Sequence, residues 1–376
     1  MSYEVDFIGV GSEVKKDADA ICFRWLDGTD YWGRSIYKVG VFDGGFEAHG
    51  KKMVEHMNQY YFNSLSYREK VIDFVFISHP DQDHTVGIKT ILENFKVRNL
   101  YMNRPWLYAD ELFDKVNDGR MTIESLRRKL RNTYKTIAEI EDIALDKGIV
   151  IHEAFQGDEV EGKLLIASPS RQLYLDLLVK SEKTPLEENQ SASSMSFSDV
   201  VKGVKNYIYS LFETWKEELL REEVETSAEN ETSIVLRGAI DFDGFLLVGD
   251  AGVIALNEAM DYLESIGEDI KESVELYQIP HHGSRHNVNP STLDRMFGER
   301  VNEGVTTGKI AIASVAKDSD HPLRIVTNAY LRRGVRPFKT DENITCHSCG
   351  NMPMRNWGHS EMIEFSREVE EYNENS

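Results

Sequence analysis

The stretch VIDFVFISHPDQDHTVG, residues 71–87, carries four side chains suited to metal chemistry directly after an apolar run. His79, Asp81 and Asp83 are spaced two apart, so extended backbone would direct them to one side, and His84 approaches from the next element. Imidazole and carboxylate donors around one point suit a divalent metal ion, or two ions that share a carboxylate. A solvated turn would use Asp, Pro and Gly but has no need of two histidines. The spacing therefore predicts a metal site.

Two later apolar runs end in similar residues. GFLLVGDAG places Asp250 at the end of a predicted strand, and ELYQIPHHGSRH places His281 and His282 after another. An Asp at a strand end is commonly a turn former or helix cap. Three strand ends that all carry His or Asp predict one shared site, because loops anchored on rigid strands are where binding and catalytic groups concentrate.

The elements that must position these residues alternate along the chain. Short runs rich in β-branched and aromatic residues predict strands, and segments of helical spacing lie between them. The expected fold class is α/β. The predicted strands are YEVDFIGV, AICFRWLDG, YKVGVFDGG, VIDFVFIS, GIVIHEA, LLIASP, TSIVLRGAIDFDGFLLVGD, ESVELYQIPH and KIAIASV. The predicted helical segments are residues 46–62, 108–146, 256–267 and 321–334.

The region at about 170–229 interrupts this alternation. It begins with the helical RQLYLDLLVKSEK, continues through the Ser-rich TPLEENQSASSMSFSD, and ends in a charged amphipathic helix around YIYSLFETWKEELLREEVE. We interpret it as a helical and linker insertion into a single domain of residues 1–376, and as a possible docking site for a protein partner. The acidic tail at about 366–376 is expected to fray.

Composition narrows the class of protein. The chain has 376 residues, 41% of them hydrophobic, and 64 acidic against 43 basic residues give a net charge of −21. This charge opposes indiscriminate binding to phosphate backbones or anionic membranes. The sequence has no apolar stretch of 18 residues, no signal-peptide layout at its N-terminus and only three cysteines. We therefore expect a cytoplasmic protein without membrane association.

At the residues that predict the metal site, the sequence resembles the metallo-β-lactamase fold superfamily, and most closely the ComEC-type nuclease domain. The superfamily motif is HxHxDH and the ComEC-type variant is HxDxDH, which residues 79–84 match as HPDQDH. The resemblance covers roughly residues 3–345 outside the insertions. It implies an αββα sandwich with a metal site at one edge, and phosphodiester hydrolysis, although the superfamily hosts other hydrolyses. The further similar stretches are VGSEVKKDADAICF, VFDGG, LLIASPS, NETSIVLRG, LLVGDA, PHHGSRH and HPLRIVTNAYLRRGVRPFKTDEN.

The resemblance also implies a set of ligands for two divalent ions. His282 is preferred over His281 because the last ligand of the family commonly precedes a glycine, here Gly283. The sequence departs from the zinc-type pattern at Asp81, which replaces a histidine, and at residues 229–233 (ENETS), where a third histidine is usual. An oxygen-rich half-site moves the preference from zinc towards manganese or magnesium. One ion would be held by Asp83, His84 and His282, with Asp250 bridging to a second ion held by His79 and Asp81.

The expected activity is that of a metal-dependent hydrolase. The preferred interpretation is a phosphodiesterase or nuclease that cleaves nucleic acid or nucleotides with a metal-activated hydroxide. Asp81 or Asp83 would orient this nucleophile. His321, in DSDHPLR, would bind phosphate or protonate the leaving oxygen, or else serve as a structural His-Pro helix entry. Ser284 and Arg285 would contact a phosphate oxygen, or else form an ordinary polar turn.

The sequence is also compatible with two other functions. The same scaffold could hydrolyse an amide, ester or lactone, or the chain could be an effector subunit that depends on a partner docked on the insertion. The charge of −21 favours small nucleotides, or DNA handed over by a partner, above free DNA. The sequence does not separate DNA from RNA as the substrate.

Overall fold

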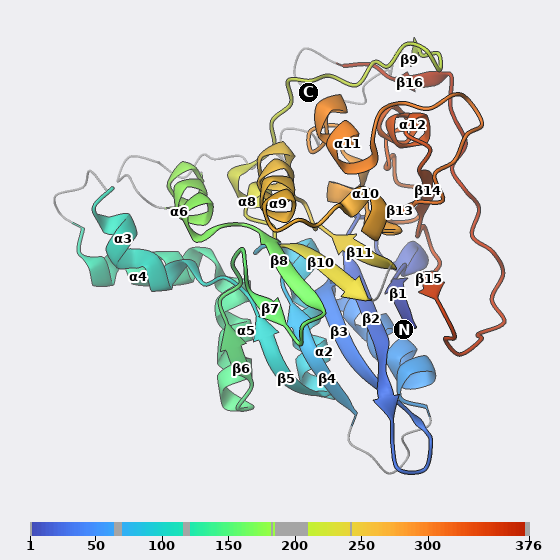
Figure 1. Cartoon of the computed structure of the whole chain (residues 1–376). Coiled ribbons are helices and arrows are strands. Elements are labelled where there is room, and N and C mark those ends of the chain that lie inside the picture. Colours follow the sequence, from blue (N-terminus) through green and yellow to red (C-terminus); the bar gives the residue numbers. More distant parts are fainter. Residues whose placement is uncertain are drawn as a thin grey trace.

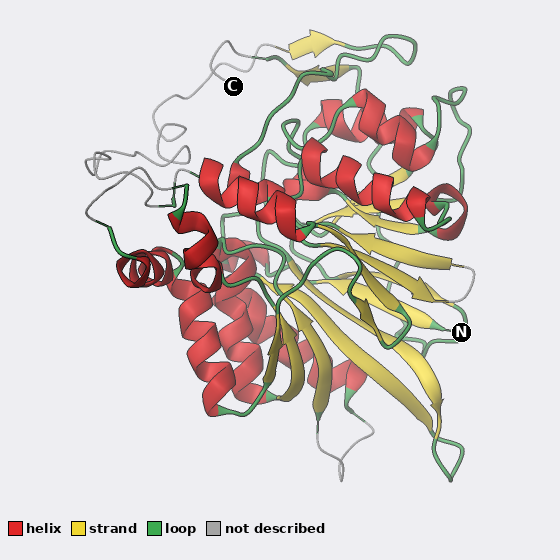
Figure 2. Cartoon of the chain, turned by 60° about the vertical axis from the view of Figure 1, so that its left-hand side comes forward, coloured by secondary structure: helices red, strands yellow, loops and turns green. Residues whose placement is uncertain are grey.

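Two seven-stranded mixed sheets stack face to face, and helices cover both outer surfaces (Figures 1 and 2). This computed structural model describes residues 2–63, 70–115, 121–181, 183–184, 210–240 and 243–372. The α/β class predicted from the sequence is confirmed, and the layers are those of an αββα sandwich such as the metallo-β-lactamase fold. The Ser-rich middle of the predicted insertion lies outside the described residues.

The first sheet is antiparallel at one side and parallel at the other, in the order β15-β1-β2-β3-β4-β5-β6. Its strand β4 reads VIDFVF and is almost wholly buried, as expected of a central parallel strand covered on both faces. The strands are β1 (Tyr3–Phe7), β2 (Ala20–Thr29), β3 (Ser35–Gly44), β4 (Val71–Phe76), β5 (Lys96–Tyr101), β6 (Val150–His152) and β15 (Thr345–Cys349).

The second sheet has the order β14-β13-β12-β11-β10-β8-β7, with β11 to β14 parallel to one another. Its strands are β7 (Glu159–Val160), β8 (Leu164–Ser168), β10 (Val235–Ile240), β11 (Asp243–Leu247), β12 (Leu276–Gln278), β13 (Ile310–Ala313) and β14 (Arg336–Lys339). A separate two-stranded sheet pairs β9 (Ser210–Phe212) with β16 (Glu368–Glu370).

The helices fall into two outer layers and a lateral group. On the first sheet lie α1 (Glu47–His56), α2 (Gln82–Asn94) and α5 (Lys135–Asp146). On the second sheet lie α9 (Val253–Ser265), α10 (Ile270–Ser273), α11 (Pro290–Phe297) and α12 (Arg324–Arg332). At the side lie α3 (Ala109–Phe113), α4 (Ile123–Thr133), α6 (Arg171–Lys180) and α8 (Ala228–Glu231). Short helical turns are η1 (Gly11–Glu13), η2 (Met57–Tyr61), η3 (Pro105–Tyr108) and η5 (Pro280–Gly283).

Three apolar cores correspond to the three interfaces between the four layers. The core between the sheets is rich in aromatic side chains, among them Phe23, Trp25 and Phe245. A second core joins the first sheet to its helices, and a third joins the second sheet to α9, α11 and α12. The central core fixes the two sheets against each other, so that loops from both sheets keep a defined spacing at their shared edge.

The second half of the predicted insertion differs from the expectation. The sequence predicts a charged helix around residues 207–225, yet residues 210–212 form β9 and the following stretch through residue 225 contains no helix. The buried Arg332 donates hydrogen bonds to the carbonyl oxygens of Thr214, Trp215 and Glu217. These bonds satisfy carbonyls that a helix would otherwise pair with its own backbone, so tertiary contacts override the local pattern. The predicted first helix of the insertion is present as α6.

The acidic tail also contains more order than its composition suggests, because β16 pairs with β9 in an antiparallel ladder. Val369 is buried against the core of the second sheet. Residues 373–376 lie outside the described part of the chain. In the part of the chain that the structure describes, no helix combines the length and apolarity needed to cross a membrane.

Candidate metal centre

The predicted site residues follow the carboxyl ends of strands in both sheets. His79 to His84 follow β4, Asp250 follows β11, and His282 lies in the η5 turn after β12, while Asp43, which was not predicted, lies at the end of β3. Asp19 precedes β2, and it reaches the same edge because β2 runs antiparallel to β3, with Ala20 opposite Gly44. Two sheets therefore contribute to one centre.

Two glycines allow the close approach that this convergence needs. Gly87, in the first turns of α2, packs so tightly on the end of β3 that an added Cβ would lie 2.0 Å from the Gly44 carbonyl oxygen. The Gly87 amide also donates to the Gly45 carbonyl at 2.7 Å. Gly249 has φ +53 in the turn before Asp250, a conformation that disfavours other residues. The helix that carries His84 is thus held against the strand that carries Asp43.

Asp19, His84, Asp250 and His282 form the centre of the site. All four are buried, and each offers a ligand atom that lies within 4.8 Å of the others. His84 Nε2 lies 3.2 Å from Asp250 Oδ1. His84 Nε2, His282 Nε2, Asp250 Oδ1 and both carboxylate oxygens of Asp19 have no hydrogen-bond partner among the described residues. Buried polar atoms are normally satisfied, so these atoms point to a missing ligand.

In His84 and His282, the ring nitrogen Nδ1, which does not face the centre, fixes the orientation of the ring. His84 Nδ1 lies 2.8 Å from Asp43 Oδ2, and His282 Nδ1 lies 2.8 Å from the Ser314 carbonyl oxygen. A carbonyl can only accept, so His282 carries its proton on Nδ1 and presents the lone pair of Nε2 to the centre. Metal-binding histidines are held by such outer contacts. The donor set therefore fits a divalent ion, with two imidazole nitrogens and two carboxylates.

The electrostatics of the centre also favour a cation. Burial works to lower the pKa of His84, yet the carboxylates of Asp250 and Asp43 outweigh it and raise that pKa well above its usual value. Burial raises the pKa of Asp19, against the opposing charges of His282 and His84. A fully buried carboxylate without a hydrogen bond is costly unless a cation neutralises it.

His79 and Asp81 lie beside this centre. His79 Nε2 is 3.7 Å from Asp250 Oδ2 and 4.0 Å from Asp81 Oδ2, and it has no hydrogen-bond partner. Burial, then the charge of His84, lowers the pKa of His79 to about 4, so its ring is neutral at pH 7. Asp81 is half-exposed, and its Oδ1 accepts a hydrogen bond from Lys183 Nζ at 2.6 Å.

Asp83 and His281 lie at the rim. Asp83 Oδ2 is 3.8 Å from His282 Nε2, and His281 Nε2 is 3.6 Å from Asp250 Oδ2. His281 and His282 both have positive φ, at 45° and 58°. Such strain in non-glycine residues is concentrated at functional sites. The preference for His282 over His281 agrees with the burial of His282 in the four-residue centre.

The other predicted residues lie farther out. His321 Nδ1 is 2.9 Å from Asp17 Oδ2, and its ring is half-exposed. Arg285 donates to the Glu371 carbonyl oxygen and stacks over the Tyr372 ring, so its guanidinium group is engaged by the C-terminal segment. Ser284 is buried, and its hydroxyl accepts from the His286 amide at 3.3 Å.

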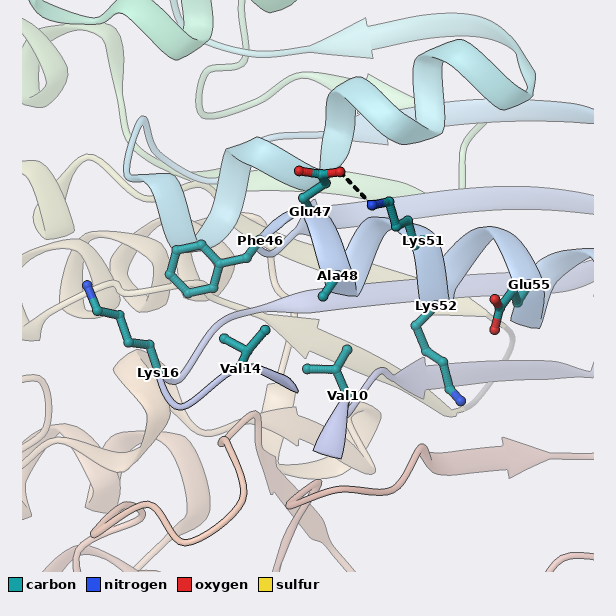
Figure 3. Close-up of a pocket in the computed structure, with 9 residues that line it drawn as sticks. All are labelled: Val10, Val14, Lys16, Phe46, Glu47, Ala48, Lys51, Lys52 and Glu55. Atoms are coloured by element: carbon teal, nitrogen blue, oxygen red, sulfur yellow. Dashed lines mark ion pairs between the residues drawn. The ribbon is translucent and has the colours of Figure 1, made fainter. Parts of the chain in front are cut away.

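A pocket lies between the segment before β2 and the start of α1 (Figure 3). It has a volume of about 610 Å³, with Val10, Val14 and Phe46 among the apolar residues of its walls. Lys16, Lys51 and Lys52 lie on its rim together with Glu47 and Glu55, and Lys51 pairs with Glu47 at 2.6 Å. In the sequence, Lys16 lies three residues before Asp19 and Phe46 three residues after Asp43.

Sequence reasoning missed three residues of this site. Asp19 and Asp17 lie in KKDADAICF, which contributed only to the family resemblance, and Asp43 lies in VFDGG. The signal for Asp43 is the one that identified Asp250, an acidic residue at the end of an apolar strand followed by a small residue. Asp19 lies at the start of a strand, where only knowledge of the antiparallel pairing of β2 with β3 reveals its position.

Comparisons with known proteins add little to this picture. The sequence matches no protein-family model and no curated protein. Among solved structures, the chain is similar to a long form RNase Z from yeast, with 10% identity and a TM-score of 0.37 over 92% of this chain and 41% of that chain. The chain spans about two fifths of the length of that protein. A TM-score of 0.37 is too low to carry an argument, so the fold assignment rests on the chain's own sheet order.

Proposed function

We propose that this protein is a metal-dependent hydrolase of phosphodiester bonds in nucleic acids or nucleotides. The observation that carries the proposal is the convergence of unpaired ligand atoms from Asp19, His84, Asp250 and His282 in one buried centre at the edge of both sheets. The HxDxDH motif of the ComEC-type nuclease resemblance supports the phosphodiester substrate. When bound, a divalent ion supplies Lewis-acid activation of water and of a phosphoryl oxygen.

The residues around the centre have separable roles in this proposal. Asp250, His84 and His282 hold the ion, with Asp19 as a further ligand. Asp83 lies at the rim, 3.8 Å from His282, where its carboxylate orients the attacking water. His321 donates a proton to the leaving oxygen, and Asp17 holds the His321 ring in place through Nδ1. Ser284 would contact a phosphate oxygen in this proposal.

The pocket favours a nucleotide chain over a small neutral substrate. Its apolar walls include the ring of Phe46, and its rim carries three lysines on a chain whose net charge is −21. Nucleic-acid strands are bound by this combination of stacking and positive charge.

The test is incubation with labelled single- and double-stranded DNA and RNA, and with bis(p-nitrophenyl) phosphate, with manganese, magnesium or zinc added separately. We expect metal-dependent cleavage that the chelator EDTA stops. The double variant Lys16→Glu and Lys52→Glu should raise KM for oligonucleotides and leave turnover of bis(p-nitrophenyl) phosphate unchanged. Hydrolysis of a chromogenic ester, a lactone or a β-lactam amide in place of every phosphodiester would instead support the second candidate function.

A further inference from the structure

The metal centre has two halves that differ in what they offer to a cation. The first half brings Asp19, His84, Asp250 and His282 within 4.8 Å of one another. Within the described residues, no group of three or more such donors contains His79 or Asp81. The region where relatives carry a third histidine supplies Ser233, whose hydroxyl contacts His79 Nδ1 at 3.3 Å and accepts from the Asp250 amide at 3.2 Å. The second half therefore offers fewer protein ligands than the first, and an ion there would depend on the Asp81 carboxylate.

The ammonium group of Lys183 lies at this second half. Lys183 Nζ is 2.6 Å from Asp81 Oδ1, a distance typical of a charge-assisted hydrogen bond. The two residues are about a hundred positions apart in the sequence, so tertiary structure brings them together. Asp81 is the residue that the family pattern would use as a ligand of the second ion.

Lys183 is held in place by its neighbours. It follows the end of α6, where Ser181 and Thr184 are both buried and both lie 3.4 Å from the Tyr134 hydroxyl. Ser181 also donates to Glu229, which belongs to the segment that replaces the third histidine. The contacts of Ser181 and Thr184 thus place Lys183 beside Asp81, and the Lys183 amide donates to the Ser181 hydroxyl at 3.1 Å.

The side chain of Lys183 carries a positive charge at neutral pH. A lysine side chain is ordinarily charged at pH 7, and the Asp81 carboxylate 2.6 Å from Lys183 Nζ favours the charged form. A divalent ion bound to Asp81 would lie next to this ammonium group, and two positive charges at such a distance repel each other strongly. The ammonium group and a second ion therefore compete for one carboxylate.

We propose that the ammonium group of Lys183 replaces the second metal ion, so that the centre binds one divalent ion and uses a lysine as its second positive charge. The inference deepens the proposed function and rests on it for the role of the lysine, which would face a charged oxygen of the phosphodiester. The bound ion would lie in the first half of the centre, at Asp19, His84, Asp250 and His282.

The experiment is a metal titration of the full chain, with manganese and zinc in separate runs, followed by isothermal titration calorimetry and by plasma mass spectrometry after desalting. We expect one ion per wild-type chain. Lys183→Met should bind a second ion, because Asp81 is released, and Lys183→Arg should return the count to one. Lys180→Met is the matched control, since Lys180 is an exposed lysine at the end of the same helix, and it should behave as wild type.

A second variant keeps the proposal testable if Lys183→Met does not fold. Asp81→Asn removes the carboxylate for which the lysine and a second ion would compete, and the proposal expects one ion per chain to remain. Two ions in the wild type, falling to one in Asp81→Asn, would overturn it, as would a single ion in a folded Lys183→Met. These counts do not depend on turnover. Failure to cleave any phosphodiester would therefore refute the proposed function and leave the ion count as an independent result.

Discussion

Among the described residues, two buried groups of potential metal ligands differ in how their donors are satisfied: Asp6 with Cys22 and His56, and Asp19 with His84, Asp250 and His282. In the first group, Asp6 on β1 accepts from Tyr61 at 2.6 Å and from both terminal nitrogens of Arg355, at 2.7 and 2.9 Å, with His56 Nε2 at 3.0 Å. In the second group, Asp19 has no hydrogen-bond partner for either oxygen. Both groups bring three or more donors within ligand distance.

This difference distinguishes a group that stabilises the fold from a candidate metal site. The carboxylate of Asp6 is neutralised by the protein, so an added ion would have to displace Arg355, whose side chain also neutralises Glu4. Among the described residues, the carboxylates around His84 pair with histidines, which can bind a metal ion, and with no arginine or lysine. Burying a charge without a partner costs free energy, and native proteins keep such unfavourable arrangements mainly at functional sites. Residue types alone would place a metal ion in either group, whereas the unpaired donors select the second.

The largest expected effect comes from removing the carboxylate at the middle of the second group. Asp250→Ala should reduce turnover to background and lower metal content, because the Asp250 carboxylate lies 3.2 Å from His84 Nε2 and 3.7 Å from His79 Nε2. Asp83→Ala should also abolish turnover. Little apolar packing is lost, so the chain should stay folded. Plasma mass spectrometry and circular dichroism provide the measurement, and wild-type metal content in Asp250→Ala would refute the assignment.

The first group should respond through stability instead. Arg355→Ala leaves the buried carboxylate of Asp6 without its arginine, whereas Glu4 keeps Arg24, and loss of one partner from a buried pair costs about 3–5 kcal/mol of unfolding free energy. Metal content should not change. Arg34→Ala, which breaks an exposed pair with Asp30, is the control and should cost about 0.5 kcal/mol. Urea denaturation distinguishes them, and a loss of bound metal in Arg355→Ala would mean that the first group also binds an ion.

A smaller effect on metal affinity is expected from a residue that contacts the ligand His84 from outside the centre. Asp43→Asn keeps the shape of the side chain but removes the charge that orients His84 at 2.8 Å. Changes to such outer partners typically lower metal affinity about 10- to 100-fold. Calorimetric titration with manganese or zinc measures this. Unchanged affinity would place Asp43 in a purely structural role with Ser78, which donates to it from both its amide and its hydroxyl.

The smallest effect should appear as a pH dependence of the metal-free chain. Burial raises the pKa of Asp19 above its unfolded value, so the charged carboxylate destabilises the fold above that pKa, and the penalty disappears as pH falls through it. Asp19→Asn should therefore unfold at higher temperature than wild type at pH 7 in EDTA, with the gap narrowing towards acid. Metal should reverse the order. Parallel melting curves at every pH would show that Asp19 is neutral or otherwise paired.

The sequence predicted the parts of this site that follow strands. His79, His84, Asp250 and His282 each come after an apolar run, and a local pattern suffices to find them. Asp19 precedes its strand, so it reaches the centre only through the pairing of β2 with β3. The ion pair of Lys183 with Asp81 joins segments about a hundred residues apart and has no local signature. The missed residues are those whose position depends on tertiary structure.

The same distinction applies to the fold. The α/β class followed from the alternation of strand and helix patterns, and the helices at residues 46–62 and 256–267 agree with α1, η2 and α9. The helix predicted around residues 207–225 is wrong because Arg332 and the pairing with β16 supply the backbone partners. Amphipathic spacing reports the local preference, and a buried arginine with several carbonyl contacts is enough to override it.

The pairing of β1 with β15 has a consequence for synthesis. Tyr3 and Cys349 lie opposite each other in the ladder, about 340 residues apart in the chain. At the usual translation rates of 5–20 residues per second, β1 would wait roughly 17–70 s for this partner. The four donors of the centre are all made by residue 282, well before β15. The nascent chain can therefore acquire its ion while the edge of the first sheet is still open, and metal capture would precede closure of the sandwich on the ribosome.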